Sequence, residues 1–229
     1  MKHIFISLLV ITSLAYGCKK EHISNQESSE IDVILKNNSS NPYEYIGEEH
    51  NLALAHIISI NSTDYTDAVS YISQSLNEPQ SRFADWTIIQ SGVNAAIADG
   101  YGEFNTLTND PDIGSYLGNL KSILLNSNST NIASNIAPLV NSILNASNGL
   151  SDKNRTLLLA TTALGKHSFV YWSDSQGGSG ISNVWRDAVG FLQGFRLEWD
   201  NNLGLDGTAV KLGSSLLSGL GGAVIASGS

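Results

Sequence analysis

The stretch NPYEYIGEEHN, residues 41–51, carries the clearest fold signal in the chain. Asparagine is a favoured N-cap and proline suits the first position of a helix, so Asn41 and Pro42 predict a helix start. Glu44 stands where a capping box places an acidic side chain. At 3.6 residues per turn, one face of this helix carries Tyr43, Ile46, Gly47, His50, Leu54 and Ile57. The stretch therefore predicts a helix whose apolar face includes a glycine and a histidine.

Most later segments show the same helical period. Apolar residues recur at four-three-four spacing over residues 65–76 and again over residues 113–124. Pro138 lies inside a further helical segment and predicts a kink or a split there. We find no run of four or more alternating apolar and polar residues bounded by hairpin turns. The sequence therefore predicts a single all-α domain of about seven or eight helices.

The N-terminus, MKHIFISLLVITSLAYGCKKE, has a short basic start, an apolar run over residues 4–14, and small residues before Cys18. This order is typical of a secretory signal, and the apolar run is too short to span a bilayer. Cys18 is the only cysteine, so no internal disulfide can form. A lone cysteine at this place resembles a bacterial lipobox, whose cysteine is acylated and becomes the mature N-terminus. Tyr16 departs from the usual lipobox, so an ordinary secretory signal is the alternative.

Three regions follow from these patterns. We expect residues 1–17 to be a lipoprotein signal peptide. Residues 18–40 would hold the acylated Cys18 and a flexible tether, because this segment is rich in Ser, Asn and Glu. Residues 41–229 would form the helical domain, ending in a glycine-rich hairpin. Lipid on Cys18 predicts a cell-envelope location, at the outer membrane or the cell surface.

The charge balance bears on possible partners. Charged residues are 14% of the chain, and the formal net charge is -9. Phosphate binding needs clustered Lys and Arg, and the sequence offers only the pair at residues 19–20. We therefore expect no nucleic-acid partner. The expected partners are a membrane, reached through the N-terminal lipid, and a protein partner or a second copy of the chain.

His50 is the main candidate for chemistry, with Glu48 and Glu49 beside it. A metal site on this helix would need a second ligand three or four residues away, but positions 46, 47, 53 and 54 are Ile, Gly, Ala and Leu. Two interpretations stay open: a core histidine that meets a group from another helix, or a catalytic histidine working with Glu48 or Glu49. Gly47 lowers helix stability by about 1 kcal/mol relative to alanine, so it predicts a close approach of another helix or a bulky side chain.

Other motifs give weaker signals. Ser179 in GGSG lacks the strand that precedes a nucleophile elbow, and we expect a loop there. The segment DNNLGLDG, residues 200–207, departs from a calcium loop at its fifth and sixth positions. No Walker or dinucleotide motif occurs. The sequence therefore predicts neither a metal nor a cofactor.

The C-terminal part is rich in small residues. GFLQG at residues 190–194 and the segment LGSSLLSGLGGAVIASGS place small residues every three or four positions, a spacing that lets helix backbones approach closely. The apolar run over residues 212–226 is shorter than a membrane span requires. We expect a tightly packed helical hairpin within the domain. Reversible membrane insertion or self-assembly is the alternative.

Three pieces together resemble a known group of proteins: the NPYEYIGEEHN opening, HSFVYWSDS at residues 167–175, and the end DAVGFLQG…GLGGAVIASGS. The combination is similar to uncharacterised Bacteroidota lipoproteins and secreted proteins. These begin with an Asn-Pro-Tyr…Gly…His-Asn helix and finish in a glycine-zipper-like tail. The resemblance implies an envelope location and an all-helical build, and it implies no activity.

We therefore expect a membrane-anchored envelope lipoprotein with a non-enzymatic helical binding or assembly domain. One alternative is a hydrolase that uses His50 with a nearby carboxylate. A second is a membrane-active helical protein that works through its glycine-rich tail.

Overall fold

A computed structural model describes residues 40–62, 64–78, 86–98, 107–176, 180–201 and 208–227. Over these residues the chain forms eight α-helices, one short 3-10 helix and no strand, so the prediction of an all-α domain is confirmed. In chain order they are α2 (Glu44–Ser59), α3 (Tyr65–Leu76), α4 (Trp86–Ala98), α6 (Gly114–Leu125), α7 (Ile132–Leu144), η2 (Ala146–Asn148), α8 (Asp152–Gln176), α9 (Ile181–Asn201) and α10 (Thr208–Ser227).

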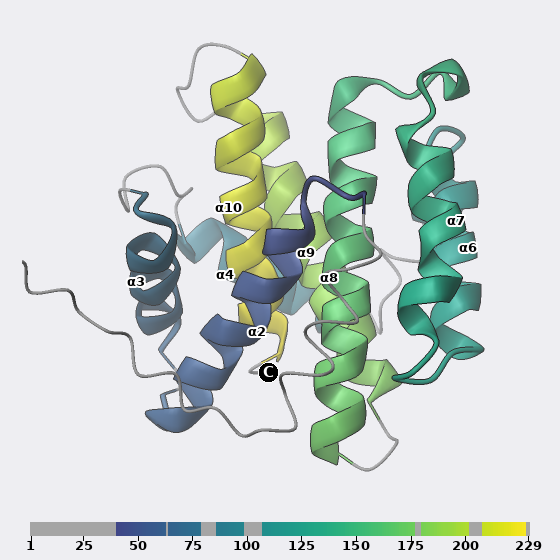
Figure 1. Cartoon of the computed structure of the whole chain (residues 1–229). Coiled ribbons are helices and arrows are strands. Elements are labelled where there is room, and N and C mark those ends of the chain that lie inside the picture. Colours follow the sequence, from purple (N-terminus) through teal and green to yellow (C-terminus); the bar gives the residue numbers. More distant parts are fainter. Residues whose placement is uncertain are drawn as a thin grey trace, which may run out of the picture.

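The three longest helices, α8, α9 and α10, form the centre of the domain, and α2 packs across them (Figure 1). The helices α6 and α7 cover α8 on one side, while α3 and α4 lie on the other side against α2, α9 and α10. Large side chains such as Phe191 and Phe195 are fully buried in the centre. The outer described helices α2, α3, α4, α6 and α7 each bury one face against this core and turn the other toward solvent.

Glycines set the distance between α9 and α10. A Cβ on Gly190 would overlap the backbone of Gly222, and a Cβ on Gly194 would overlap the backbone of Ser218. The small residues of the two helices therefore face each other, and their backbones approach more closely than larger side chains allow. The predicted close-packed hairpin has this arrangement. No described helix is long and apolar enough to cross a membrane.

The start of α2 differs from the prediction by two residues. The regular helix begins at Glu44 and not at Pro42, and residues 42–43 form a turn before it. The Asn41 side-chain oxygen still accepts a local hydrogen bond from the Tyr43 backbone N–H (3.0 Å), as an N-cap side chain does. Its amide donates a second bond to the Leu159 backbone oxygen in α8 (2.7 Å), so Asn41 also ties this turn to α8.

The buried face of α2 is the predicted one, with Ile46, Gly47, His50, Ala53, Leu54 and Ile57 inside. Gly47 fits its predicted use: an added Cβ would lie 2.6 Å from the backbone oxygen of Ala163 and 2.6 Å from the ring of His167, both in α8. Pro138 lies inside α7, which continues past it as one helix and is not split.

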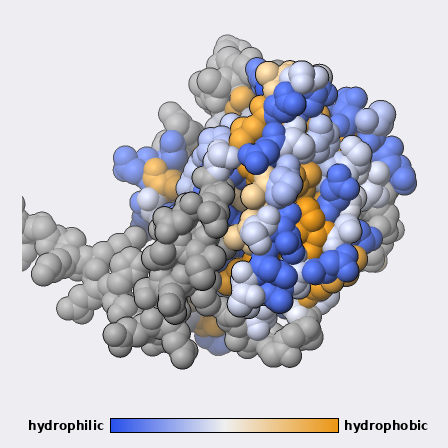
Figure 2. Space-filling model, turned by 45° about the vertical axis from the view of Figure 1, so that its right-hand side comes forward, coloured by the Kyte–Doolittle hydropathy of each residue, from blue (hydrophilic) through white to orange (hydrophobic). Residues whose placement is uncertain are grey.

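The surface visible in Figure 2 is mostly polar, with apolar residues in narrow streaks between polar ones. Large apolar side chains that are well exposed in the described part are Tyr45, Leu52 and Ile58 of α2, Ile60 directly after it, Ile88 of α4 and Leu125 of α6. Exposed apolar side chains are common on protein surfaces. Buried polar groups lie in the core, and a pocket lies at the start of α8.

Candidate functional site: a buried polar network and a pocket at the start of α8

His50 lies in the core, where α2 meets α9 and α10, and it is 0% exposed. Its Nε2 atom is 3.1 Å from Ser227 Oγ at the end of α10 and 3.6 Å from an oxygen of Asp187 in α9. Its Nδ1 atom is 3.0 Å from the side-chain oxygen of Asn51. The groups from other helices that meet His50 are therefore a carboxylate and a hydroxyl.

Asp187 is the centre of this network and is also 0% exposed. Its carboxylate accepts hydrogen bonds from the hydroxyls of Ser168 and Ser227 and from the indole N–H of Trp172 (2.9 Å). A buried carboxylate is stable only when such donors replace water. Burial raises the pKa of the nearby Tyr171 hydroxyl, and the negative charge of Asp187 raises it further.

The neighbours of His50 constrain one of its ring nitrogens. Asn51 donates its amide N–H to the backbone oxygen of His167 (3.0 Å), so its side-chain oxygen faces the ring and accepts from Nδ1. The Ser227 hydroxyl lies within hydrogen-bond distance of Asp187 and of the backbone oxygen of Ala223. The other ring nitrogen, Nε2, thus faces a hydroxyl and a carboxylate in a site closed to solvent.

A second network joins the first turn of α2 to α8. The carboxylate of Glu44 meets His167 Nε2 (2.6 Å) and the ammonium of Lys166. Lys166 and His167 are both buried, and Glu44 is only slightly exposed. Glu44, predicted as a capping residue, therefore serves as an ion-pair partner for α8.

Two glutamates were predicted to assist His50, and they precede it on α2. The Glu49 side chain instead accepts a hydrogen bond from Ser75 of α3 (2.6 Å). The Glu48 side chain is half-buried on the helix flank. The carboxylate that sequence reasoning missed is Asp187. One signal could have found it: Asp187 shares an apolar face of α9 with Val184 and Phe191, and a carboxylate there needs a buried partner.

A pocket of about 270 Å³ lies at the start of α8, where α2, α7 and α10 converge. Its walls combine apolar side chains with a few polar ones, as small-molecule sites do. The lining residues are Pro42, Tyr43, Leu144, Asp152, Arg155, Thr156, Leu159 and Leu212.

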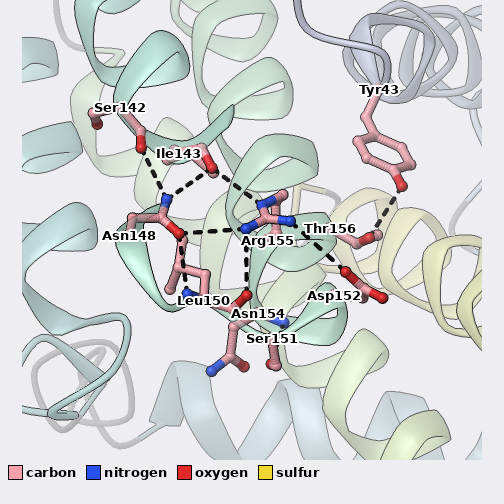
Figure 3. Close-up of polar contacts among 10 residues, drawn as sticks. All are labelled: Tyr43, Ser142, Ile143, Asn148, Leu150, Ser151, Asp152, Asn154, Arg155 and Thr156. Atoms are coloured by element: carbon pink, nitrogen blue, oxygen red, sulfur yellow. Dashed lines mark hydrogen bonds and ion pairs between the residues drawn. The ribbon is translucent and has the colours of Figure 1, made fainter. Parts of the chain in front are cut away.

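Arg155 is held in a fixed position in this pocket (Figure 3). Its Nε and Nη2 atoms donate to the backbone oxygens of Ile143 and Leu150 and to the side chain of Asn148, each at 3.3 Å. Its Nη1 atom lies 3.7 Å from a carboxylate oxygen of Asp152, which is an ion-pair distance and too long for a hydrogen bond. The guanidinium thus binds the end of α7 on one side and presents Nη1 on the other.

Two hydroxyls also line this pocket. Tyr43 and Thr156 are hydrogen-bonded to each other at 3.0 Å (Figure 3). One bond between two hydroxyls uses one of their two protons, so the second proton can be donated to another acceptor. Asp152 completes the polar set at the mouth of the pocket, with its side chain 83% exposed.

Several predicted positions lie outside the described residues: Cys18, Ser179 and residues 202–207 of the segment at residues 200–207. Among the described residues, no three His, Cys, Asp or Glu side chains come together as metal ligands. Comparison of the chain with protein-family models, with curated proteins and with solved structures finds no match. The function of the helical domain is therefore inferred from the buried polar network and the pocket alone.

Proposed function

We propose that this protein is a lipid-anchored envelope protein whose helical domain binds a partner or assembles at the membrane without catalysing a reaction. The observation that carries the proposal is the state of the buried ionisable groups. His50 with Asp187, and His167 with Glu44, are closed pairs between helices. Buried groups that satisfy one another in this way hold a fold together, and in the described part of the chain these two histidines are engaged with groups from other helices.

The anchoring part of the proposal rests on the N-terminal sequence, with its apolar run and its single Cys18. The test is growth of producing bacteria with a labelled fatty acid, comparing the natural chain with Cys18→Ser. We expect label on the natural chain, membrane association of that chain, and loss of both in the variant. A natural chain that takes up no label would overturn the lipid anchor and leave an ordinary secreted protein.

The hydrolase alternative depends on one contact, the 3.1 Å distance between Ser227 Oγ and His50 Nε2. A fluorophosphonate probe, which reacts with activated serines, separates it from the binding proposal. We expect no labelling of the folded protein. Labelling that disappears in Ser227→Ala would show that Ser227 is an activated nucleophile and would replace the binding proposal with the hydrolase.

A further inference from the structure

We propose that the pocket at the start of α8 binds a free amino acid with an apolar side chain. This inference rests on the proposed binding function and names the ligand class for it. The pocket has a volume of about 270 Å³. Its lining combines the cation of Arg155, the anion of Asp152, the hydroxyl pair described above and four apolar side chains. That volume is just below the usual range for drug-sized ligands, so the occupant is small.

The carboxylate of the ligand would meet Arg155 and the hydroxyl pair. Arg155 is already oriented by three hydrogen bonds of 3.3 Å through Nε and Nη2, so binding would cost little side-chain entropy. Its Nη1 atom retains hydrogen-bonding capacity, because its nearest carboxylate oxygen is 3.7 Å away. The Tyr43 and Thr156 hydroxyls share one hydrogen bond, so one of their two protons supplies a further donor in the same pocket.

The ammonium group of the ligand would meet Asp152, which lines the same pocket as Arg155. The two side chains have opposite charges, so the empty pocket is neutral. A ligand with only a carboxylate would compete with Asp152 for Arg155, and a ligand with only an amine would compete with Arg155 for Asp152. A zwitterion pairs with both charges, which leaves neither one desolvated and unpaired.

The apolar part of the ligand would lie against the remaining walls. Leu144 comes from α7, Leu159 from α8 and Leu212 from α10, and Pro42 closes the side next to α2. Side chains from different helices surround a small volume, and this shape suits a branched aliphatic group better than a long chain. Leucine is therefore the probe that fits the combined chemistry.

The test is a calorimetric titration of the full chain with leucine, with 4-methylpentanoate, which lacks the amine, and with leucinamide, which lacks the carboxylate. We expect leucine to bind most tightly. Asp152→Asn should weaken the binding of leucine about two- to fivefold, the range for an exposed ion pair, whereas the binding of 4-methylpentanoate should stay equal or become tighter, because the substitution removes the carboxylate that competes for Arg155. The matched control is Asp200→Asn, which removes an exposed carboxylate that pairs with Lys153 outside the pocket lining. This variant should leave the affinity for both ligands unchanged.

Two further variants locate the binding. Leu144→Trp should fill the pocket and weaken leucine at least about tenfold. If circular dichroism shows that this variant is unfolded, Tyr43→Phe replaces it, since it removes one hydroxyl and keeps the ring; a loss of several-fold is expected. No heat of binding up to about 10 mM leucine, or binding that survives both variants, would overturn the inference. The fatty-acid labelling of Cys18 is independent of these results, so the proposed anchoring can stand where the ligand fails.

Discussion

The exchange Asp187→Asn tests the buried network most directly. The substitution keeps the shape of the side chain and removes its charge. The new amide can accept through only one oxygen, whereas the carboxylate accepts from Ser168, Ser227 and Trp172 through two. His50, whose Nε2 atom is 3.6 Å from this carboxylate, loses a polar partner in a site that water does not reach. We therefore expect a large loss of stability.

The expected magnitude follows from the burial of both partners. Leaving a buried donor without its acceptor typically costs about 1–3 kcal/mol, and the whole free energy of unfolding of a domain is about 5–15 kcal/mol. The measurement is urea unfolding followed by far-ultraviolet circular dichroism. The slope with urea should not change, since the folded core stays the same. Asp200→Asn is the control, because Asp200 is 56% exposed and its 3.1 Å pair with Lys153 is worth at most about 1 kcal/mol.

A double-mutant cycle with His50→Ala separates the pair from the rest of the network. If Asp187 and His50 compensate each other, Asp187→Asn should cost about 1–3 kcal/mol less in the His50→Ala background than alone. Equal costs in the two backgrounds, or a cost for Asp187→Asn no larger than for Asp200→Asn, would refute the coupling between Asp187 and His50.

Three more predictions follow from single contacts. Gly47→Ala should lower the free energy of unfolding by about 1–3 kcal/mol, because its Cβ would lie 2.6 Å from a backbone oxygen of α8. Gly118→Ala is the matched control: its Cβ would have nothing within 4 Å, so it should raise the free energy of unfolding by up to about 1 kcal/mol. Urea unfolding measures both. Gly190→Ala should likewise destabilise the α9–α10 contact, and an unchanged unfolding midpoint would contradict the close packing described here. Tyr171 should ionise at lower pH in Asp187→Asn, because burial still raises its pKa but the carboxylate no longer does, and ultraviolet absorbance of the phenolate against a Tyr171→Phe reference detects the change.

The Tyr171 shift also has a consequence for stability. Its folded pKa lies above its unfolded value, so the stability linked to this group is fully present below the unfolded pKa and is lost as the pH rises through the folded pKa. The alkaline side of the stability profile should therefore become less steep in Tyr171→Phe. A profile unchanged by this substitution would show that the hydroxyl contributes nothing to the pH dependence.

The periodic features of the fold were predictable from the sequence. The buried face of α2 follows from residues spaced at 3.6 per turn, and this period needs no knowledge of the neighbouring helices. The role of Gly47 was predictable for a related reason: a glycine in a helix costs stability, so its presence implies a contact that a side chain would block.

Pairings between distant residues were not predictable. Spacing places His50 on an inner face, but it does not say that Asp187 and Ser227 will meet it, because these contacts depend on how three helices cross. The bond from Asn41 to a backbone oxygen of α8 was not predictable for the same reason, because that oxygen is close only in the folded chain. In the sequence, Arg155 looks like an ordinary surface residue. Only the fold shows that its guanidinium bonds to the backbone oxygen of Ile143 near the end of α7.

The stretch NPYEYIGEEHN connects the two sites. Its beginning forms one wall of the pocket through Pro42 and Tyr43, and the Tyr43 hydroxyl bonds to Thr156 of α8. Its middle allows close packing through Gly47, and its end enters the core network through His50 and Asn51. The pocket wall thus lies in the turn that leads directly into α2, and the buried network involves the same helix. A change that loosens either of them acts on the same helix, so the stability of the core determines how firmly the pocket wall is held.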